Sequence, residues 1–255
     1  MAVGVYLQWE AVGRSTFVAG ASFLAMPIRG GCGYAGTAPG LCLLPPRTMA
    51  TAMVLSRASM LFAIGCASAP VQPGVRVAAG VHVVGTPETE ICRGDDGPIR
   101  QLELGALEFD RTEATQASWA RLPGLGPDPS FGPHCPDCPV DSLTFAQAEA
   151  YCGARAKAER KPWRLPTGDE WEVMARAGTT TSTWAGDVTV CMTHDPVVAS
   201  AGWTKTTSGG QPSAVAKRPA NPWGAHDVVG NLAEWVSEPA DARGFRALRG
   251  GSWYH

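Results

Sequence analysis

A fifteen-residue stretch, Asn221–Trp235, dictates more of the fold than any other segment of the sequence. It reads NPWGAHDVVGNLAEW, with two acidic residues, two asparagines, two tryptophans and two glycines. No amphipathic period runs through it, so we predict a compact loop rather than a helix or a strand. Such a loop suits a calcium ion, because calcium takes carboxylate, amide and carbonyl oxygens and glycine lets the chain curl around it. The alternative that the residues leave open is an irregular surface loop in which Asp227 and Glu234 are ordinary acidic residues.

The rest of the sequence is rich in residues that form turns. Thirty glycines and twenty-one prolines among 255 residues favour a loop-rich fold over a helical bundle. Nine tryptophans supply large anchors for a core with little regular structure. The net charge of −2 gives no electrostatic reason to expect a nucleic-acid partner. We therefore expect one loop-rich domain with additional segments.

Local patterns predict a few short regular elements. Strands are predicted at 81–85, 102–109 and 245–249, and a short helix at 116–122. Capping-box patterns begin two further helices after Thr144 and Thr167, and Gly178 is expected to end the second of them. The range 123–139 holds six prolines and three glycines, so it is predicted to be a loop.

Several short motifs together are typical of one protein family. They are EAT at 113–115, PVDSLTFAQAEAYC at 139–152, RLPTGDEW at 164–171, GNLAEW at 230–235 and RGGSW at 249–253. In these motifs and in their order, the sequence resembles the formylglycine-generating-enzyme family, also called the sulfatase-modifying-factor domain. The resemblance implies an α+β, loop-rich fold of the C-type-lectin-like kind over residues 80–255, truncated at its C-terminal end.

The resemblance also implies metal sites. A calcium ion would be held by the side chains of Asp227 and Glu234 and by the backbone carbonyls of Gly230 and Leu232. The enzymes of this family bind copper(I), a soft ion that suits thiolates, through two cysteines just beyond RGGSW. His255 falls about where the first cysteine would stand, so we expect no catalytic residue in this sequence and Cu+ only where those cysteines exist.

Two functions from different classes follow from this resemblance. The favoured hypothesis is a non-catalytic domain that binds a partner protein or a small-molecule ligand through tryptophan-rich loops. The alternative is a copper-dependent oxidoreductase that converts a substrate cysteine to formylglycine, thereby activating sulfatases, with its active C-terminal end missing from this sequence. A third and weaker hypothesis is thiol exchange by the CPDC motif at 135–138.

The sequence pattern of the first 79 residues predicts that the protein is exported. Residues 1–48 are interpreted as a leader outside the domain or as a mis-called start. Arg57, the apolar run 58–65 and Cys66 fit a lipoprotein signal over 49–65, followed by a tether at 66–79. A lipidated Cys66 would anchor the protein to the membrane in the bacterial cell envelope, in the periplasm or at the outer membrane. The alternative is a disordered, alanine-rich leader.

Cysteine usage agrees with an oxidising compartment. The CPDC motif lies in a proline-rich loop rather than after a strand of a βαβ unit, which favours a disulfide over a thioredoxin-like or zinc site. In the related family the cysteine of the AYC helix pairs with a later cysteine, so the resemblance leaves Cys152 unpaired. Two bridges of open connectivity are then expected among Cys92, Cys135, Cys138 and Cys191.

Overall fold

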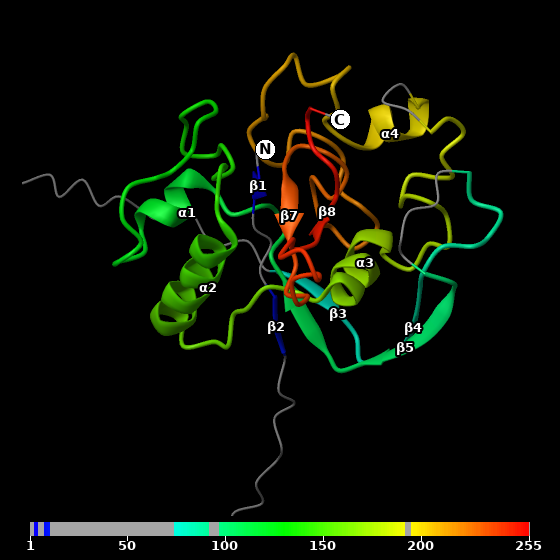
Figure 1. Ribbon diagram of the computed structural model, residues 1–255, viewed down its shortest axis with the longest axis horizontal. Helices are drawn as coiled ribbons and strands as arrows, with labels where there is room; N and C mark the ends of the chain where they lie inside the picture. Colours follow the sequence, from blue (N-terminus) through cyan, green and yellow to red (C-terminus); the bar gives the residue numbers. More distant parts are fainter. Residues whose placement is uncertain (1–2, 5–7, 11–73, 92–96, 192–194, 255) are drawn as a thin grey trace, which may run out of the picture. The chain divides into compact units, whose positions relative to one another are not determined.

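The regular elements of the protein are short and are joined by long loops (Figure 1). The computed structural model describes residues 3–4, 8–10, 74–91, 97–191 and 195–254. Its strands are β1 (Val3–Gly4), β2 (Gln8–Glu10), β3 (Val75–Val77), β4 (Gly80–Val84), β5 (Arg100–Leu104), β6 (Leu107–Phe109), β7 (Ala233–Trp235) and β8 (Leu248–Arg249). Its helices are α1 (Gln116–Ala120), α2 (Phe145–Glu159), α3 (Gly168–Arg176) and α4 (Pro196–Ala201).

The described strands form three small sheets, in the orders β1-β7-β8, β2-β6-β3 and β4-β5. Only the pairing of β1 with β7 is parallel among these, with Val3 opposite Ala233. In Figure 1, β7 and β8 lie side by side next to α3, while α1 and α2 lie together. The described part of the chain is therefore an α+β fold. None of its helices has the length and apolar character needed to cross a bilayer.

Two short strands lie in the first ten residues of the chain, within the range 1–48 that is interpreted as a leader or a mis-called start. Strand β1 pairs with β7, and strand β2 pairs with β6. A strand edge offers free N–H and C=O groups, which is why a short extended segment can join it. The described residues belong to one compact unit. The predicted signal and Cys66 lie outside the described residues.

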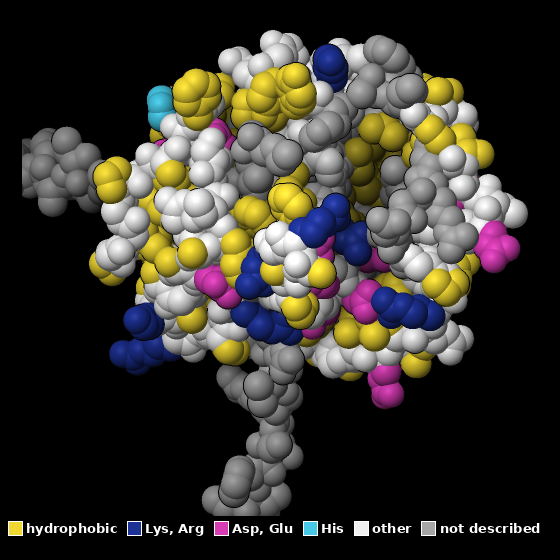
Figure 2. All heavy atoms as spheres, viewed as in Figure 1, with side chains coloured by type: hydrophobic (Ala, Val, Ile, Leu, Met, Phe, Trp, Pro, Cys, Tyr) yellow, Lys and Arg dark blue, Asp and Glu magenta, His cyan; other side chains and the backbone are white. Residues whose placement is uncertain are grey.

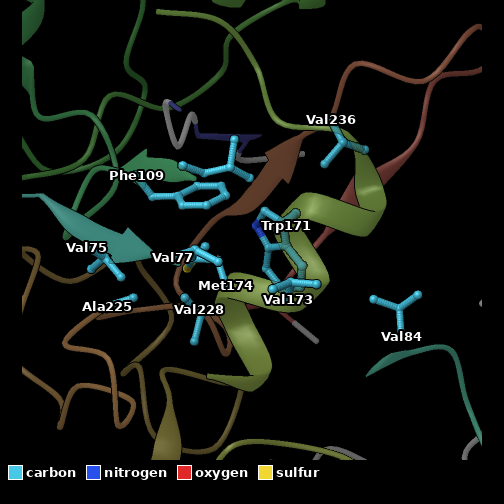
Figure 3. Packing of buried hydrophobic residues seen from close by; sticks show 11 residues of the cluster. Val75, Val77, Val84, Phe109, Trp171, Val173, Met174, Ala225, Val228 and Val236 are labelled. Carbon is cyan, nitrogen blue, oxygen red and sulfur yellow. The ribbon is translucent and has the colours of Figure 1, made fainter. Parts of the chain in front are cut away.

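One core cluster packs α3 against β3 and β6. Thr167 and Glu170 form the predicted capping box, since each side chain accepts a hydrogen bond from the other residue's backbone N–H. The helix thereby turns Trp171, Val173 and Met174 into a cluster with buried residues of the two strands (Figure 3). Burying each large apolar side chain stabilises the fold by about 1.5–3 kcal/mol.

A second cluster holds α1 and α2 together. The predicted capping box at Thr144 and Gln147 is present and begins α2. Trp119 of α1 stacks on Tyr151 of α2, with ring centroids 5.8 Å apart and planes 4° from parallel. The Tyr151 hydroxyl donates to the Ser118 hydroxyl at 2.7 Å, so the buried ring keeps its polar group satisfied.

Three element boundaries differ from the prediction. The range 102–109 is divided between β5 and β6 at Gly105, because β5 pairs with β4 whereas β6 pairs with β3. The predicted strand 245–249 is reduced to β8. Helix α3 ends at Arg176 and is capped by Ala177, which is in the left-handed conformation at φ 49°; the predicted cap Gly178 follows it with φ 84°.

Helix α4 was not predicted, although Asp195 marks its start. The Asp195 carboxylate accepts from the backbone N–H groups of Val197 at 2.8 Å and Val198 at 3.2 Å. It also accepts from those of Thr189 at 2.6 Å and Val190 at 3.0 Å. Burial alone would raise the pKa of Asp195, but these donors, Thr189 foremost, hold it well below its usual value.

Some large apolar side chains remain at the surface. Phe131 is 92% exposed, Tyr254 62% and Val81 62%. Figure 2 shows hydrophobic side chains spread among charged ones on one face of the molecule. Isolated exposed apolar residues are ordinary, so only those that line a cavity need a functional account.

Candidate metal-binding loop and adjoining cavity

The stretch 221–235 is a tightly curled loop that ends in β7. Asp227 and Asn231 adopt left-handed backbone conformations, with φ of 58° and 56°, and Gly230 has φ 79°. Aspartate and asparagine are the residues other than glycine that tolerate this conformation best. At Gly230 a side chain would not fit, because a Cβ there would lie 2.1 Å from the Trp203 carbonyl oxygen.

The first half of the loop is organised by Asn221. Its side-chain oxygen accepts from the Trp223 N–H at 3.1 Å and from the Ala225 N–H at 3.0 Å. Its amide nitrogen donates to the Met174 carbonyl oxygen at the end of α3, at 2.8 Å. One buried asparagine thus shapes the turn and ties it to the core helix.

The two predicted carboxylates are both buried, and each is only partly satisfied. Asp227 is 1% exposed, and its Oδ2 accepts from the Ala216 N–H at 2.7 Å. Glu234 is 0% exposed, and its Oε2 accepts from the Trp171 indole N–H at 2.6 Å. The second oxygen of each group, Asp227 Oδ1 and Glu234 Oε1, is buried without a hydrogen-bond partner. Buried polar atoms in this condition are uncommon and call for an explanation.

A third buried carboxylate, Glu113, was not identified as part of the site from the sequence. It lies between β6 and α1 and is 1% exposed. Its Oε1 accepts from the Leu232 N–H at 2.9 Å, and its Oε2 accepts from the Asn231 side-chain amide at 2.7 Å. An acid in the motif EAT gives no sign of this role, because its partners lie more than a hundred residues further along the chain.

The three carboxyl groups influence one another. Burial raises the pKa of Glu113 well above its usual value, and the charges of Asp227 and Glu234 raise it further. Burial also raises the pKa of Glu234 strongly, with a smaller rise from Asp227. The pKa of Asp227 is raised by burial, against the opposing hydrogen bond from Ala216. A nearby cation would relieve this accumulation of buried negative charge.

The donor set fits a hard cation in part. Two orphaned carboxylate oxygens in one buried loop are the chemistry that calcium prefers, and backbone carbonyls complete such sites. Among the described residues, however, no group of three or more His, Cys, Asp or Glu side chains is arranged to hold a metal. A calcium site at this loop therefore needs the backbone carbonyls of Gly230 and Leu232 in addition to the side chains of Asp227 and Glu234.

A cavity of about 660 Å³ adjoins the loop at Ala233. Its walls come from three further parts of the chain, at 131–142, at Pro212 and at 248–254. Aromatic and aliphatic groups dominate the lining, including Phe131, Leu248 and Trp253. No local pattern in the sequence predicts this cavity, because its walls are far apart in the chain.

Among the described residues, three cysteines are disulfide-bonded and one is a free thiol. A disulfide joins Cys135 to Cys138, and Cys191 is also disulfide-bonded. Cys152 is a free thiol within the second core cluster, and burial raises its pKa to about 12. Cys92 lies outside the described residues.

Comparison with protein families gives a match over most of the chain. The profile described as "Sulfatase-modifying factor enzyme 1-like domain" matches residues 66–255. "Inactive C-alpha-formylglycine-generating enzyme 2" of Bos taurus is 33% identical in an alignment of 121 residues, which covers 45% of this chain and 38% of the relative. "Formylglycine-generating enzyme" of Bos taurus is 24% identical in an alignment of 220 residues, which covers 64% of this chain and 57% of the relative. The chain thus spans less than two thirds of the length of either.

Solved structures share the fold. "Treponema denticola variable protein 1" superposes with a TM-score of 0.52 at 20% identity, over 71% of this chain and 84% of that one. PvdO from Pseudomonas aeruginosa superposes with a TM-score of 0.53 at 22% identity, over 70% and 81%. The predicted loop-rich α+β fold, of the formylglycine-generating-enzyme and C-type-lectin-like kind, is confirmed.

Proposed function

Because the chain belongs to the sulfatase-modifying factor enzyme 1-like family, we propose that it is a non-catalytic member that binds a partner protein or a small-molecule ligand. The cavity beside β7 carries this proposal. Its volume of about 660 Å³ lies within the roughly 300–1,000 Å³ that is usual for small-molecule sites. The similarity to an inactive bovine member of the family gives further support.

The lining is suited to an apolar or aromatic group with a polar edge. Phe131, Trp253 and Tyr254 present broad aromatic surfaces, and such side chains dominate the energy of binding sites. Asp141 is already engaged, because its two oxygens accept from the backbone N–H groups of Phe131 and Gly132, each at 2.9 Å. Affinity would therefore come mainly from stacking and apolar contact.

A matched pair of variants tests the cavity. Leu248→Glu places a charge in the lining, whereas Val81→Glu places the same charge at an exposed position of β4. With the fluorescent probe 8-anilinonaphthalene-1-sulfonate, wild type and Val81→Glu should show the same saturable binding, and Leu248→Glu should lose it. Equal binding of the probe by all three proteins would contradict the cavity as the binding site.

The same proposal includes one calcium ion that stiffens the loop. The side chains of Asp227 and Glu234 and the carbonyls of Gly230 and Leu232 would hold it. Bound calcium would supply positive charge among buried carboxylates, and the chain's own residues fix the loop around it. The orphaned oxygens of Asp227 and Glu234 support this part of the proposal.

The proposal places the protein at the bacterial cell envelope, in the periplasm or at the outer membrane, anchored by a lipid on Cys66. A mature chain that starts at Cys66 would lack β1 and β2, but it would keep all of the family match, which covers residues 66–255. Mass spectrometry of the protein from membrane fractions would detect acyl groups on an N-terminal Cys66. An unmodified chain that begins upstream would contradict the anchor.

One comparison favours the alternative, a copper-dependent oxidoreductase. The bovine formylglycine-generating enzyme aligns with 64% of this chain. Incubation of the protein with copper(I), oxygen and a cysteine-containing peptide distinguishes the two functions. The binding function predicts no aldehyde in the peptide, whereas aldehyde that can be captured by a hydrazide would establish the enzyme.

A further inference from the structure

The disulfide Cys135–Cys138 closes a four-residue turn whose two cysteines differ in exposure. Cys138 is buried, at 4% exposed, whereas Cys135 is half-buried. The neighbours His134, Pro136 and Asp137 are exposed. An external thiol can therefore approach the turn from the Cys135 side while Cys138 stays within the fold.

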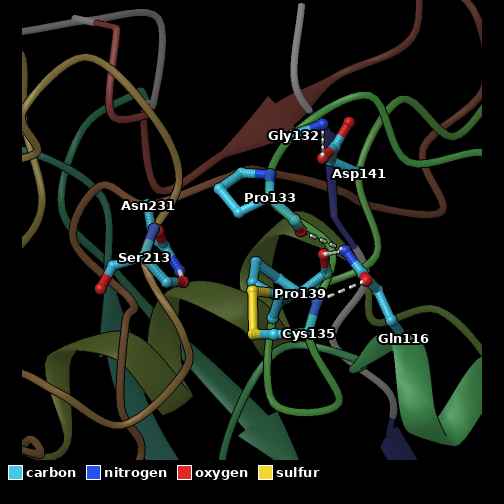
Figure 4. The surroundings of a disulfide bond; sticks show 9 residues. Gln116, Gly132, Pro133, Cys135, Pro139, Asp141, Ser213 and Asn231 are labelled. Atoms are coloured by element: carbon cyan, nitrogen blue, oxygen red, sulfur yellow. Dashed lines mark hydrogen bonds between the residues drawn. A yellow bond between two sulfur atoms is a disulfide. The ribbon is translucent and has the colours of Figure 1, made fainter.

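The turn is a hydrogen-bonding centre for α1. The Cys138 carbonyl accepts from the Gln116 N–H at 2.9 Å, and the Pro136 carbonyl accepts from the Ala117 N–H at 3.1 Å. The Gln116 side chain accepts from the Cys135 N–H at 3.1 Å and donates to the Pro133 carbonyl at 2.9 Å. Figure 4 shows Gln116 reaching from α1 to both ends of this turn.

The turn also connects to the candidate calcium loop. The Asp137 carbonyl accepts from the Val215 N–H at 2.9 Å. The adjacent Ala216 N–H donates to Asp227, and nearby Ser213 exchanges hydrogen bonds with the Asn231 side chain. A change in the turn therefore reaches the loop through one short segment, 213–216.

The chain on both sides of the disulfide, within the range 131–142, lines the cavity. Phe131 and Gly132 precede the turn, Asp141 and Ser142 follow it, and all four line the cavity. The disulfide thus closes the tip of the 131–142 segment, and the two ends of this segment form one wall of the cavity. Pro212, next to the 213–216 segment, lines another part of the cavity.

We propose that Cys135–Cys138 is a thiol-exchange site at which a dithiol reductant loosens this wall and the 213–216 segment. One thiolate of the dithiol attacks the Cys135 sulfur, and the Cys135–Cys138 bond breaks as a mixed disulfide forms. Cys138 leaves as a thiolate and takes a proton. The second thiolate of the dithiol attacks the reagent sulfur of the mixed disulfide, so that Cys135 leaves and is protonated in turn. The protein disulfide becomes two thiols, and the dithiol becomes a cyclic disulfide.

The effect of reduction is local. A cross-link over so short a loop lowers the population of open conformations of the turn by a factor of about ten to thirty. The backbone N–H groups of Gln116, Ala117 and Val215 donate to this turn, so they lose protection when it opens. The N–H groups of Ala148 and Trp171 lie within other helices and serve as internal controls.

Hydrogen exchange with and without dithiothreitol tests the proposal on the full chain. Reduction should speed exchange at Gln116, Ala117 and Val215 about tenfold to thirtyfold, with Ala148 and Trp171 unchanged. Thiol labelling and mass spectrometry should show that Cys135 and Cys138 are reduced in the native protein. In a Cys135→Ser/Cys138→Ser variant, the same N–H groups should exchange at the fast rate with or without dithiothreitol.

Three results would each overturn the proposal. The first is a Cys135–Cys138 disulfide that dithiothreitol fails to reduce in the native protein. The second is reduction of this disulfide without faster hydrogen exchange at Gln116, Ala117 and Val215. The third is acceleration by dithiothreitol in the double variant, which would assign the effect to the disulfide of Cys191. The cavity part rests on the proposed binding function, whereas exchange and labelling need neither ligand nor calcium, so the two can fail separately.

Discussion

Replacing Gly230 by alanine should destabilise the protein more than replacing another glycine of the same backbone conformation. Gly230 has φ 79° and Gly209 has φ 68°, so both lie in the left-handed region. A Cβ at Gly209 would meet nothing within 4 Å, whereas a Cβ at Gly230 would lie 2.1 Å from the Trp203 carbonyl oxygen. The pair therefore separates backbone strain from the close approach of two segments.

The magnitude follows from these two terms. Left-handed backbone costs an L-residue about 1–2 kcal/mol, which both variants share. Overpacking against rigid backbone adds about 1–3 kcal/mol, and only Gly230→Ala incurs it. For a domain of this size, about 2–4 °C accompanies each kcal/mol, so the two melting temperatures should differ by about 2–12 °C.

Thermal unfolding followed by circular dichroism measures this difference, with a chelator present to exclude any effect of bound metal. Urea unfolding of the same proteins supplies the free energies of unfolding. Equal destabilisation by the two variants would refute the close packing of the loop against Trp203. A Gly209→Ala variant that costs more than Gly230→Ala would do the same.

Three further measurements test other parts of the structure. The pKa of Asp195 is lower in the folded state than in the unfolded state, so the ionised carboxylate stabilises the fold at a pH above its unfolded pKa. This stabilisation is lost as the pH falls toward the folded pKa. The free energy of unfolding of wild type should therefore fall more steeply below about pH 4 than that of Asp195→Asn. Burial raises the pKa of Cys152 to about 12, so iodoacetamide at pH 8 should label this thiol only after unfolding in urea, and rapid labelling of native protein would contradict its burial. Glu113→Ala leaves the buried Leu232 N–H without an acceptor and should lower the free energy of unfolding in urea by at least about 1–3 kcal/mol, whereas Glu149→Ala, at an exposed position of α2, should change it hardly at all.

Local signals in the sequence predicted local structure well. Thr144 and Thr167 begin α2 and α3 through capping boxes, each of which spans only three residues along the chain. The proline-rich range 123–139 contains no helix or strand, as predicted. The start of α4 at Asp195 was missed, although aspartate followed by proline is a recognised helix start.

Long-range features could not be predicted in the same way. Glu113 meets Asn231 across 118 positions, and no pattern near either residue specifies that contact. The cavity likewise combines walls from 131–142 and 248–254 with single residues between them. The pairing of β1 with β7 depends on an available strand edge rather than on a motif. The family resemblance identified the loop, but it did not reveal which of its oxygens would be left without partners.

Calcium-dependent stability tests the proposed metal site most directly, because Asp227 and Glu234 are its two side-chain ligands. A ligand held at about one hundred times its dissociation constant stabilises the folded state by about 2.7 kcal/mol. The melting temperature of wild type should therefore rise in calcium relative to chelator, and Asp227→Asn/Glu234→Gln should abolish the rise, while the exposed control Asp241→Asn retains it. A wild-type melting temperature that is the same in saturating calcium and in chelator would contradict calcium binding by this loop.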